Sequence, residues 1–314
     1  MSSKILTTQA ESVRRTCERI SIIIPTRNRS AILAQCLAAL PRGAHGLNPP
    51  EVIVVDDCST DDTRKVADEF CQATSWKVHS LRQNRPMGAN AARNAALQVA
   101  RGEIIVFIDD DVLVTDGWLS KLLAGLSESF PVVSGPVRLT MDGPVFGKHR
   151  EEVQALLGEI LRSPLGFDGQ AVPVLCNLAA HRWVFETATF DESLRPPIEE
   201  ADWLRRSGVR SGFVSDAWVW HYKTQEEVAP GRVLAGVWRR GSEGGWWLRV
   251  RLRISAHERW NLAKRALKTS LRAFGHAALR GCWGGVVVGL GELSRALALA
   301  GLINRGPRVP ESWR

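Results

Sequence analysis

Two apolar runs that lead directly into clusters of carboxylates constrain the fold of this 314-residue chain more than any other feature. The first run covers residues 53–55 and the second covers residues 104–108. A run that is apolar at every position is typical of a parallel strand buried on both faces. Ligands of open α/β sheets bind outside the carboxyl ends of such strands. The carboxylates at these two ends are Asp56, Asp57, Asp109, Asp110 and Asp111.

Carboxylates gathered at one sheet edge repel each other unless a cation or polar groups lie between them. The sequence therefore predicts a crevice that holds a divalent metal ion together with a polar, anionic ligand. Taken alone, Asp57 would also suit the start of a helix, and the triplet at residues 109–111 would suit a solvated turn.

Strands and helices are predicted to alternate through the first 112 residues. Four strands are expected at residues 20–24, 51–55, 77–81 and 103–108. Amphipathic patterns and capping signals predict helices between them, at residues 31–40, 59–70 and 88–100. Ser59 or Thr60 is the expected cap of the second helix, and Asp62 completes a capping box. This order predicts an α/β fold with a mostly parallel sheet between layers of helices.

The pattern after residue 112 is less regular. Helices are expected at residues 118–130, 150–161 and 198–207, strands at 131–139, 174–180 and 213–221, and a loop at 163–173. Beyond residue 227, apolar and basic residues recur at helical spacing almost to the end of the chain. Three parts are therefore predicted: a polar leader (1–19), an α/β domain (20–225) and a helical C-terminal extension (226–314).

The extension is much more basic than the rest of the chain. Residues 226–314 contain 16 Lys or Arg against 6 Asp or Glu, a net charge of +10, which leaves −2 for residues 1–225. Six of the 12 Trp also lie there. Two interpretations stay open: a helical face that contacts anionic membrane with Trp at headgroup depth, or a helical subdomain that packs on the α/β domain.

Cysteine usage and hydropathy bear on the cellular compartment. The six Cys form no CxxC pair and several fall within apolar patterns, which favours packed thiols in a reducing cytosol. No secretory signal precedes residue 20, and Glu292 and Arg295 interrupt the most apolar late stretch, at residues 281–303. A cytoplasmic protein is expected, either free or attached to the inner face of the membrane.

Several distinctive segments follow one another in a fixed order along the chain. The first four are SIIIPTRNR (21–29), VVDDCSTDDT (54–63), GANAARNAAL (88–97) and VFIDDDV (106–112). They are followed by FDESL (190–194), IEEADWLRRSG (198–208) and DAWVWHYK (216–223). In this order and spacing, the segments resemble those of glycosyltransferase family 2, the inverting enzymes with the GT-A fold. The resemblance implies a nucleotide-sugar-binding half at residues 20–112 and an acceptor-side half at residues 113–225.

The resemblance also implies roles around a donor and a metal ion. Asp57 would accept hydrogen bonds from the nucleobase, and Asp109 would contact the ribose. Asp111 and His221 would bind Mg²⁺ or Mn²⁺ at the diphosphate, since hard cations favour such ligands. The donor is expected to be a nucleoside-diphosphate sugar, and UDP is the commonest carrier in such families. The other residues expected at the donor are Pro25, Thr26, Arg27, Arg93, Asp110 and Lys223.

The expected catalytic base lies in the second half of the chain. In the family this base is usually the Asp of a Glu-Asp pair, and the matching pair here is Glu199 and Glu200. We predict that Glu200 removes the acceptor proton during inverting transfer. Both residues would also suit the start of a helix. The alternative function is a non-catalytic module that binds nucleotide sugars, in which the change from Asp to Glu marks a lost base.

The acceptor and other functional classes are constrained less tightly. A saccharide, a lipid-linked saccharide or a small molecule would each serve as acceptor, and Ala188-Thr189 replace the Gly-Gly that the family commonly has near it. Nucleic acid is disfavoured as a partner because the acidic crevice would repel a phosphate backbone. A dinucleotide-dependent dehydrogenase is disfavoured because no GxGxxG follows the first strand.

Overall fold

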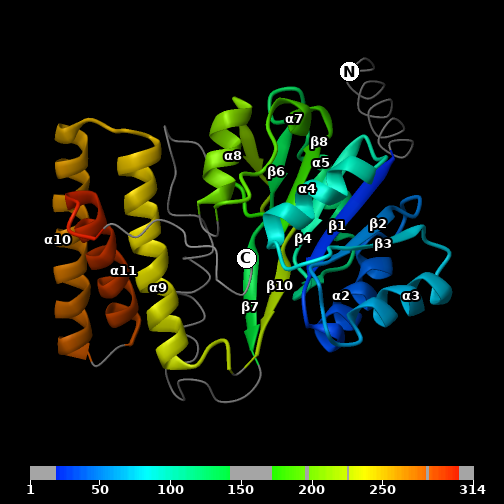
Figure 1. Ribbon diagram of the computed structural model, residues 1–314, viewed down its shortest axis with the longest axis horizontal. Coiled ribbons are helices and arrows are strands. Elements are labelled where there is room, and N and C mark those ends of the chain that lie inside the picture. The colour runs from blue at the N-terminus through cyan, green and yellow to red at the C-terminus, as the bar shows by residue number, and fades with distance from the viewer. Residues whose placement is uncertain (1–18, 142–171, 195–197, 225, 281–282, 304–314) are drawn as a thin grey trace, which may run out of the picture.

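The computed structural model describes residues 19–141, 172–194, 198–224, 226–280 and 283–303. Its core is a seven-stranded sheet with the order β3-β2-β1-β4-β8-β6-β9 (Figure 1). Neighbouring strands are parallel except at β8, which runs antiparallel to both β4 and β6. The strands are β1 (Ile20–Thr26), β2 (Glu51–Asp56), β3 (Val78–Arg82), β4 (Ile104–Ile108), β6 (Val132–Ser134), β8 (Asn177–His181) and β9 (Ser211–Phe213).

Alternate residues of the central strands face two separate hydrophobic layers. Val54 and Val106 pack with helices α2, α3 and α5 on one side of the sheet. Ile53 and Phe107 pack with α4, α7 and α8 on the other side. Burial on both faces explains the continuous apolar runs, and the predicted mostly parallel α/β sheet is confirmed. The helices are α2 (Ser30–Gly43), α3 (Thr63–Ala73), α4 (Ala89–Val99), α5 (Trp118–Ala124), α7 (Trp183–Thr187) and α8 (Glu199–Ser207).

A smaller sheet of three strands, in the order β5-β10-β7, follows directly from the end of β4. The acidic triplet at residues 109–111 occupies the turn between β4 and β5. Strand β10 is antiparallel to β5, so that His221 lies opposite Val112, the residue after Asp111. This pairing brings a strand from late in the chain against the acidic turn. The three strands are β5 (Val112–Val114), β7 (Val137–Met141) and β10 (Val219–Lys223).

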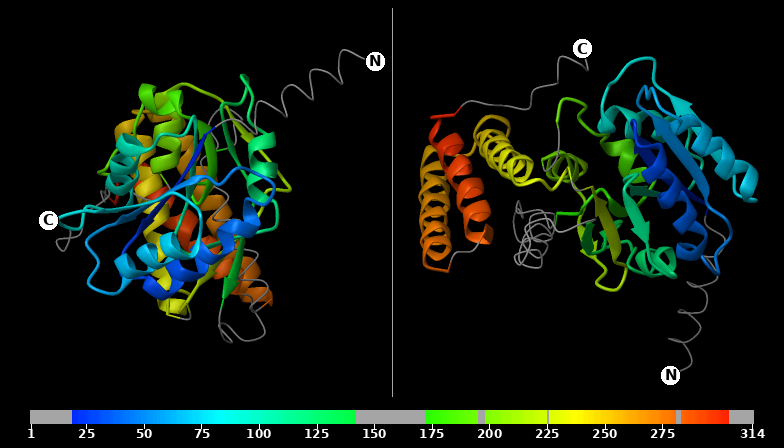
Figure 2. Two further views of the ribbon diagram at one scale, coloured as in Figure 1. Left: turned by 90° about the vertical axis from the view of Figure 1, so that its right-hand side faces the viewer. Right: turned by 90° about the horizontal axis from the view of Figure 1, so that it is seen from below.

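The C-terminal helices form a layer beside the α/β region, with α10 outermost (Figures 1 and 2). Helix α11 contacts both α9 and α10. Trp247 and Leu248 pack against Ile198 and Ala201 of the α8 segment, so the helical layer is joined to the α/β region by a shared apolar cluster. The elements are α9 (Pro230–Trp246), a π-helical turn η2 (Trp247–Arg251), α10 (Ala256–Arg280) and α11 (Trp283–Ala300). Across the described residues, every helix is too short or too polar to cross a membrane.

Glycine permits the close contact between α9 and α11. A Cβ atom at Gly241 would lie 2.1 Å from the Ser294 hydroxyl oxygen and 2.2 Å from the Gly291 carbonyl oxygen. Because any larger residue would separate the two helices, this contact fixes how closely α9 packs against α11.

Several predicted elements differ from the observed ones. The strand expected at residues 131–139 is two strands in different sheets, because the chain bends at Gly135, where a Cβ would lie 1.9 Å from the Ala217 carbonyl oxygen. The strand expected at 213–221 is likewise divided between β9 and β10, and α5 ends at Ala124 rather than at residue 130. The helix expected at 150–161, most of the 163–173 loop and nearly all of the 1–19 leader lie outside the described residues.

The second helix also begins later than predicted. Helix α3 starts at Thr63, and the capping box expected from Ser59 or Thr60 with Asp62 is wrong. Asp61 instead accepts a hydrogen bond from the Thr63 backbone N–H at 3.1 Å. The Ser59 hydroxyl is engaged elsewhere, because it accepts the Asn28 backbone N–H at 2.8 Å and so ties the β2 end to the β1 end.

Candidate active site

The carboxyl ends of β1, β2 and β4 open into a cavity of about 450 Å³. The start of α8, strand β10 and helix α9 complete its wall. Every residue predicted for the donor, the metal and the base contributes to this lining, although these residues come from distant parts of the sequence. They are Pro25, Thr26, Arg27, Asp57, Arg93, Asp109, Asp110, Asp111, Glu200, His221 and Lys223.

Three of these side chains form a group suited to a metal ion. Asp109, Asp111 and His221 each offer one ligand atom, and these atoms lie within 4.8 Å of one another. His221 Nε2 is 2.7 Å from Asp111 Oδ1, yet no well-directed hydrogen bond reaches that oxygen. An unpaired buried carboxylate oxygen beside an imidazole fits a divalent cation, because both are neutral or anionic donors of the kind that Mg²⁺ and Mn²⁺ bind.

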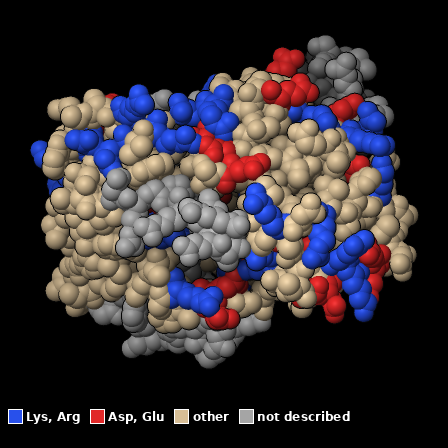
Figure 3. Space-filling view, viewed as in Figure 1, with Lys and Arg blue, Asp and Glu red and all other residues tan. Residues whose placement is uncertain are grey.

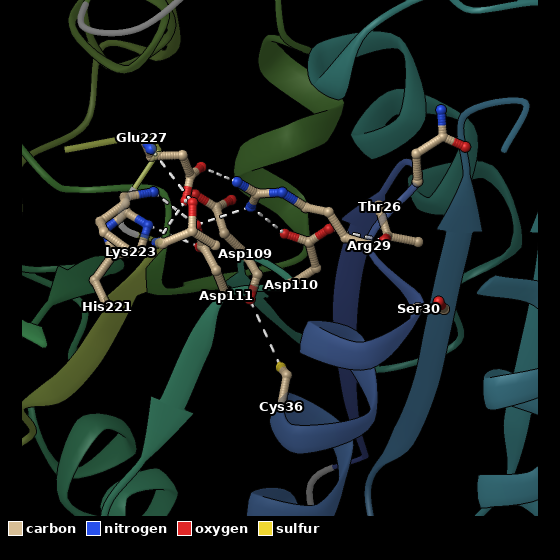
Figure 4. Close-up of polar contacts among 12 residues, drawn as sticks. Thr26, Arg29, Ser30, Cys36, Asp109, Asp110, Asp111, His221, Lys223 and Glu227 are labelled. Carbon is tan, nitrogen blue, oxygen red and sulfur yellow. Dashed lines mark hydrogen bonds and ion pairs between the residues drawn. The ribbon is translucent and has the colours of Figure 1, made fainter. Parts of the chain in front are cut away.

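Asp111 is the most heavily paired carboxylate of the cavity (Figure 4). Its Oδ2 accepts hydrogen bonds from Lys223 Nζ at 2.6 Å and from Arg29 Nη1 at 2.9 Å. Burial opposes its ionisation, but His221, Lys223 and Arg29 together hold the pKa of Asp111 well below its usual range. The side chain is therefore ionised whether or not a ligand is bound.

Asp110 is directed away from Asp111, toward β1. Its carboxylate accepts hydrogen bonds from the Thr26 hydroxyl at 2.7 Å and from Arg29 at 3.0 Å. Burial and the neighbouring Asp111 raise the pKa of Asp110 to about 6, against the opposing effect of Arg29. Asp110 therefore holds the end of β1 and the side chain of Arg29 in place. Its assignment to donor binding stays a prediction.

Asp57 connects the β2 end to the loop before α4. Its two oxygens accept the backbone N–H groups of Met87 at 2.7 Å and Gly88 at 2.9 Å. A carboxylate has about four acceptor positions, so capacity remains for a nucleobase. The preceding Asp56 supports the same turn as expected, because it accepts hydrogen bonds from the Ser59 N–H at 2.7 Å and from Arg82 at 2.6 Å.

Arg93 projects from α4 into the acidic group. Its guanidinium donates to Asp109 Oδ1 at 2.9 Å and to Asn90 Oδ1 at 3.0 Å, and the side chain is only 4% exposed. Arg93 is therefore a buried member of this group and not a surface salt-bridge residue. The ion pair orients Asp109, one of the three candidate metal ligands.

Glu199 and Glu200 occupy the first turn of α8, and both are buried. One oxygen of each carboxylate, Oε2, has no hydrogen-bond partner among the described residues. Burial raises the pKa of both, and the adjacent Glu200 raises that of Glu199 further. Backbone N–H groups and Arg93 oppose the shift at Glu200. Glu200 is thus the more readily ionised member of the pair, and it is also the more exposed, at 8% against 1%.

Three charged residues of the cavity lining, Arg29, Arg239 and Arg240, were absent from the sequence prediction. Arg29 bridges Asp110, Asp111 and Glu227, which joins β1, the acidic turn and the segment before α9 (Figure 4). Arg29 lies in the segment TRNRS (26–30), directly after the first strand. Its position at a strand end was therefore enough to predict that it lies near the cavity. Arg239 and Arg240 come from α9, whose approach to the cavity depends on tertiary packing that no sequence spacing indicates.

These features define a class of protein: an α/β sheet with an acidic, metal-compatible cleft at its strand ends and two buried carboxylates on the facing helix. Residues 21–187 match the model of glycosyl transferase family 2, which is more than half of the chain. The chain belongs to that family.

Two relatives and one solved structure illustrate the similarity. The chain is 31% identical over 125 residues to GalNAc(5)-diNAcBac-PP-undecaprenol beta-1,3-glucosyltransferase of Campylobacter jejuni, covering 40% of each chain. It is 33% identical over 110 residues to poly(ribitol-phosphate) beta-N-acetylglucosaminyltransferase TarS of Staphylococcus aureus, covering 35% of this chain and 19% of that protein. The matches thus span less than half of these relatives.

The fold is also that of a solved mannosyltransferase. PcManGT of Pyrobaculum calidifontis, in complex with GDP-Man and Mn²⁺, superimposes with a TM-score of 0.63 at 18% identity. The superposition covers 91% of this chain and 87% of that one. The predicted GT-A fold with a C-terminal helical region is therefore confirmed.

Proposed function

We propose that the protein transfers a sugar from a nucleoside-diphosphate donor to an acceptor hydroxyl, with inversion at the anomeric carbon. One observation carries this proposal: an unpaired, buried carboxylate oxygen of Glu200 lines the same cavity as Asp109, Asp111 and His221. A base and a diphosphate-binding group must both reach one sugar in such a reaction. Family membership supports the same assignment.

The strand side of the cavity would bind the donor. Asp57 and the β1 end at Pro25, Thr26 and Arg27 would hold the nucleoside, while Asp109, Asp111 and His221 would hold Mg²⁺ or Mn²⁺. When bound, the ion neutralises negative charge on the diphosphate. Arg93 keeps Asp109 oriented toward that position. The identity of the base stays a prediction, with UDP expected, and the complex of PcManGT contains GDP-Man.

The helical side would supply the base. The acceptor oxygen forms a bond to the anomeric carbon while the bond from that carbon to the phosphate oxygen breaks. The acceptor proton passes to Glu200, and the electron pair of the broken bond leaves with the nucleoside diphosphate. Lys223 and Arg29 lie beside Asp111 and would balance the charge that grows on the leaving group.

Nucleotide binding provides the first test. Purified protein is heated with UDP, GDP or TDP, with and without Mn²⁺, because a ligand that binds only the native state raises Tm. We expect one nucleotide to raise Tm by several degrees only when the metal is present, and Asp111→Asn to remove the effect. Asp116→Asn is the matched control, since Asp116 is 81% exposed at the surface. Failure of every nucleotide to stabilise the wild type would contradict the proposal.

Donor turnover then separates an enzyme from a non-catalytic module. An active transferase releases the nucleoside diphosphate from its donor sugar, slowly to water and faster when a suitable acceptor is added. A protein that binds the donor but releases no nucleotide across a broad set of acceptors would support the alternative module.

We also propose that α10 contacts an anionic membrane surface. Trp260, Leu267 and Leu271 are 49%, 43% and 65% exposed, and Lys264 and Lys268 are exposed at the same helical spacing. Figure 3 shows Lys and Arg side chains gathered at the upper end of the C-terminal helices. Exposed Trp and Leu beside Lys suit the boundary of an anionic bilayer. The cytoplasmic face of the membrane is the location expected for such contact.

A further inference from the structure

Arg240 is a cationic side chain of the cavity that has no ion-pair partner among the residues the structure describes. It projects from α9 and forms part of the cavity lining together with Arg239. Its Nε atom is buried without an acceptor among the described residues, as is that of Arg93. Unlike Arg93, however, Arg240 forms no ion pair with any described residue. The other arginines that the structure places in the acidic group are paired: Arg29 contacts three carboxylates, and Arg93 contacts Asp109.

The surroundings of Arg240 do not compensate its charge. Burial, followed by the adjacent Arg239, lowers the pKa of Arg240 to about 10, and Glu243 only partly opposes this. Glu243 already accepts a hydrogen bond from Arg239 at 3.1 Å. A partly buried guanidinium with little counter-charge costs folding free energy, so its presence in a cavity indicates a ligand that supplies the missing anion.

Phosphate is the anion that fits this side chain best. A guanidinium offers planar, paired donors that match two phosphate oxygens, and it stays charged at neutral pH even with a lowered pKa. Among the described residues, the acidic triplet at residues 109–111 forms ion pairs with Arg29 and Arg93 but none with Arg240. Arg240 belongs to the α9 wall of the cavity, whereas the triplet follows strand β4.

We propose that Arg240 binds a phosphate group of the acceptor, which makes a phosphate-bearing saccharide the acceptor class. This inference rests on the proposed function, because it assigns the donor to the strand side of the same cavity. The acceptor phosphate would enter beside α9, with the acceptor hydroxyl directed toward Glu200. Either a soluble sugar phosphate or the diphosphate of a lipid-linked saccharide would satisfy Arg240.

The test uses inorganic pyrophosphate as the probe. The full-length protein is first saturated with Mn²⁺ and the nucleoside diphosphate that stabilises it, so that the donor site is filled, and pyrophosphate is then titrated by calorimetry. We expect the wild type to bind pyrophosphate, Arg240→Gln to bind it at least tenfold more weakly, and Arg240→Lys to retain part of the affinity. Arg232→Gln is the matched control, because Arg232 lies on the same helix but is 61% exposed and outside the cavity lining.

The nucleotide affinity of each variant separates this inference from the proposed function. Arg240→Gln should bind the nucleoside diphosphate as the wild type does. If Arg240→Gln loses both nucleotide and pyrophosphate binding, Arg240 contacts the donor and the inference is wrong. The inference is also wrong if the wild type binds no pyrophosphate once the donor site is filled. A wild type that binds no nucleotide would instead remove the proposed function itself. Thermal unfolding of Arg240→Gln verifies that the variant is folded.

A second probe distinguishes the two sources of phosphate. Geranyl diphosphate carries the same diphosphate on a short isoprenoid chain. Binding at least tenfold tighter than that of pyrophosphate, and dependent on Arg240, supports a lipid-linked acceptor. Equal binding of the two probes, again dependent on Arg240, supports a soluble phosphorylated saccharide. Binding of either probe that does not depend on Arg240 contradicts the inference.

Discussion

The cavity has a strand side, formed by the ends of β1, β2 and β4 with β10, and a helical side, formed by α8 and α9. The two sides differ in how their buried charges are paired. On the strand side, Asp111 is paired with Arg29, Lys223 and His221, and Asp109 is paired with Arg93. On the helical side, Glu200 and Arg240 form no ion pair with any described residue. Single buried atoms without a hydrogen bond to the described residues occur on both sides, such as Asp111 Oδ1 and Glu200 Oε2, so the two sides differ in their ion pairs. Paired charges are held in place before any ligand arrives, whereas unpaired charges gain their partners only from a ligand. The difference suggests a preformed donor site facing a wall that the acceptor completes.

Replacement of Glu200 should have the largest effect on turnover. Glu200→Gln removes the base but keeps the size of the side chain, so turnover should fall by roughly 10²–10⁴-fold while nucleotide affinity is unchanged. Steady-state kinetics and nucleotide titration measure the two effects separately. Glu199→Gln is the control and should lose far less turnover. The opposite ranking of the two variants would assign the base to Glu199.

Arginine substitutions on the two sides should change stability in different directions. Arg29→Gln leaves Asp110, Asp111 and Glu227 short of a cation, and because Arg29 is 28% exposed we expect a loss of roughly 2 kcal/mol in the free energy of unfolding. Arg240→Gln removes an uncompensated charge and should leave the stability unchanged or higher. Urea unfolding of both variants and the wild type, without ligand, measures these differences in the free energy of unfolding. Equal destabilisation by both would show that the two sides do not differ.

The strand side was predictable from the sequence because its residues follow directly from strand order. The apolar runs at residues 53–55 and 104–108 identify buried parallel strands, and the residues after parallel strands meet at one sheet edge. The outer strands were less predictable. The bend at Gly135 depends on contact with Ala217, a residue far away in the sequence, so local patterns read β6 and β7 as one strand.

The helical side could be predicted only in part. Glu200 lies in a segment that resembles the family, whereas Arg240 lies in a helix whose pattern fits either membrane contact or packing. Its entry into the cavity depends on the packing of Trp247 against the α8 segment and on the close approach of α9 to α11 at Gly241. Both are tertiary contacts without a local signature.

The stability of Glu199→Gln should depend on pH. Burial raises the pKa of Glu199 well above its usual value, so the folded state prefers the protonated form. The stability that this carboxyl contributes is therefore complete below its unfolded-state pKa and is lost as pH rises through the higher folded-state pKa. Glutamine does not titrate, so the free energy of unfolding of the variant should exceed that of the wild type in alkaline buffer and match it in acidic buffer. Thermal unfolding across pH measures this, and a constant difference would contradict it.

The contact of α10 with membrane should show the smallest effect of a single substitution. Leu271→Ser removes one apolar side chain from a face that would enter only the bilayer boundary, so partition into vesicles should fall by roughly threefold to tenfold. Sedimentation with phosphatidylcholine vesicles, with and without phosphatidylglycerol, measures binding. Leu302→Ser is the control, because Leu302 is 75% exposed but lies after α11. If phosphatidylglycerol does not increase the binding of the wild type to vesicles, the basic face of α10 does not bind membrane and serves solubility. The functional part of the helical layer would then be the side that lines the cavity.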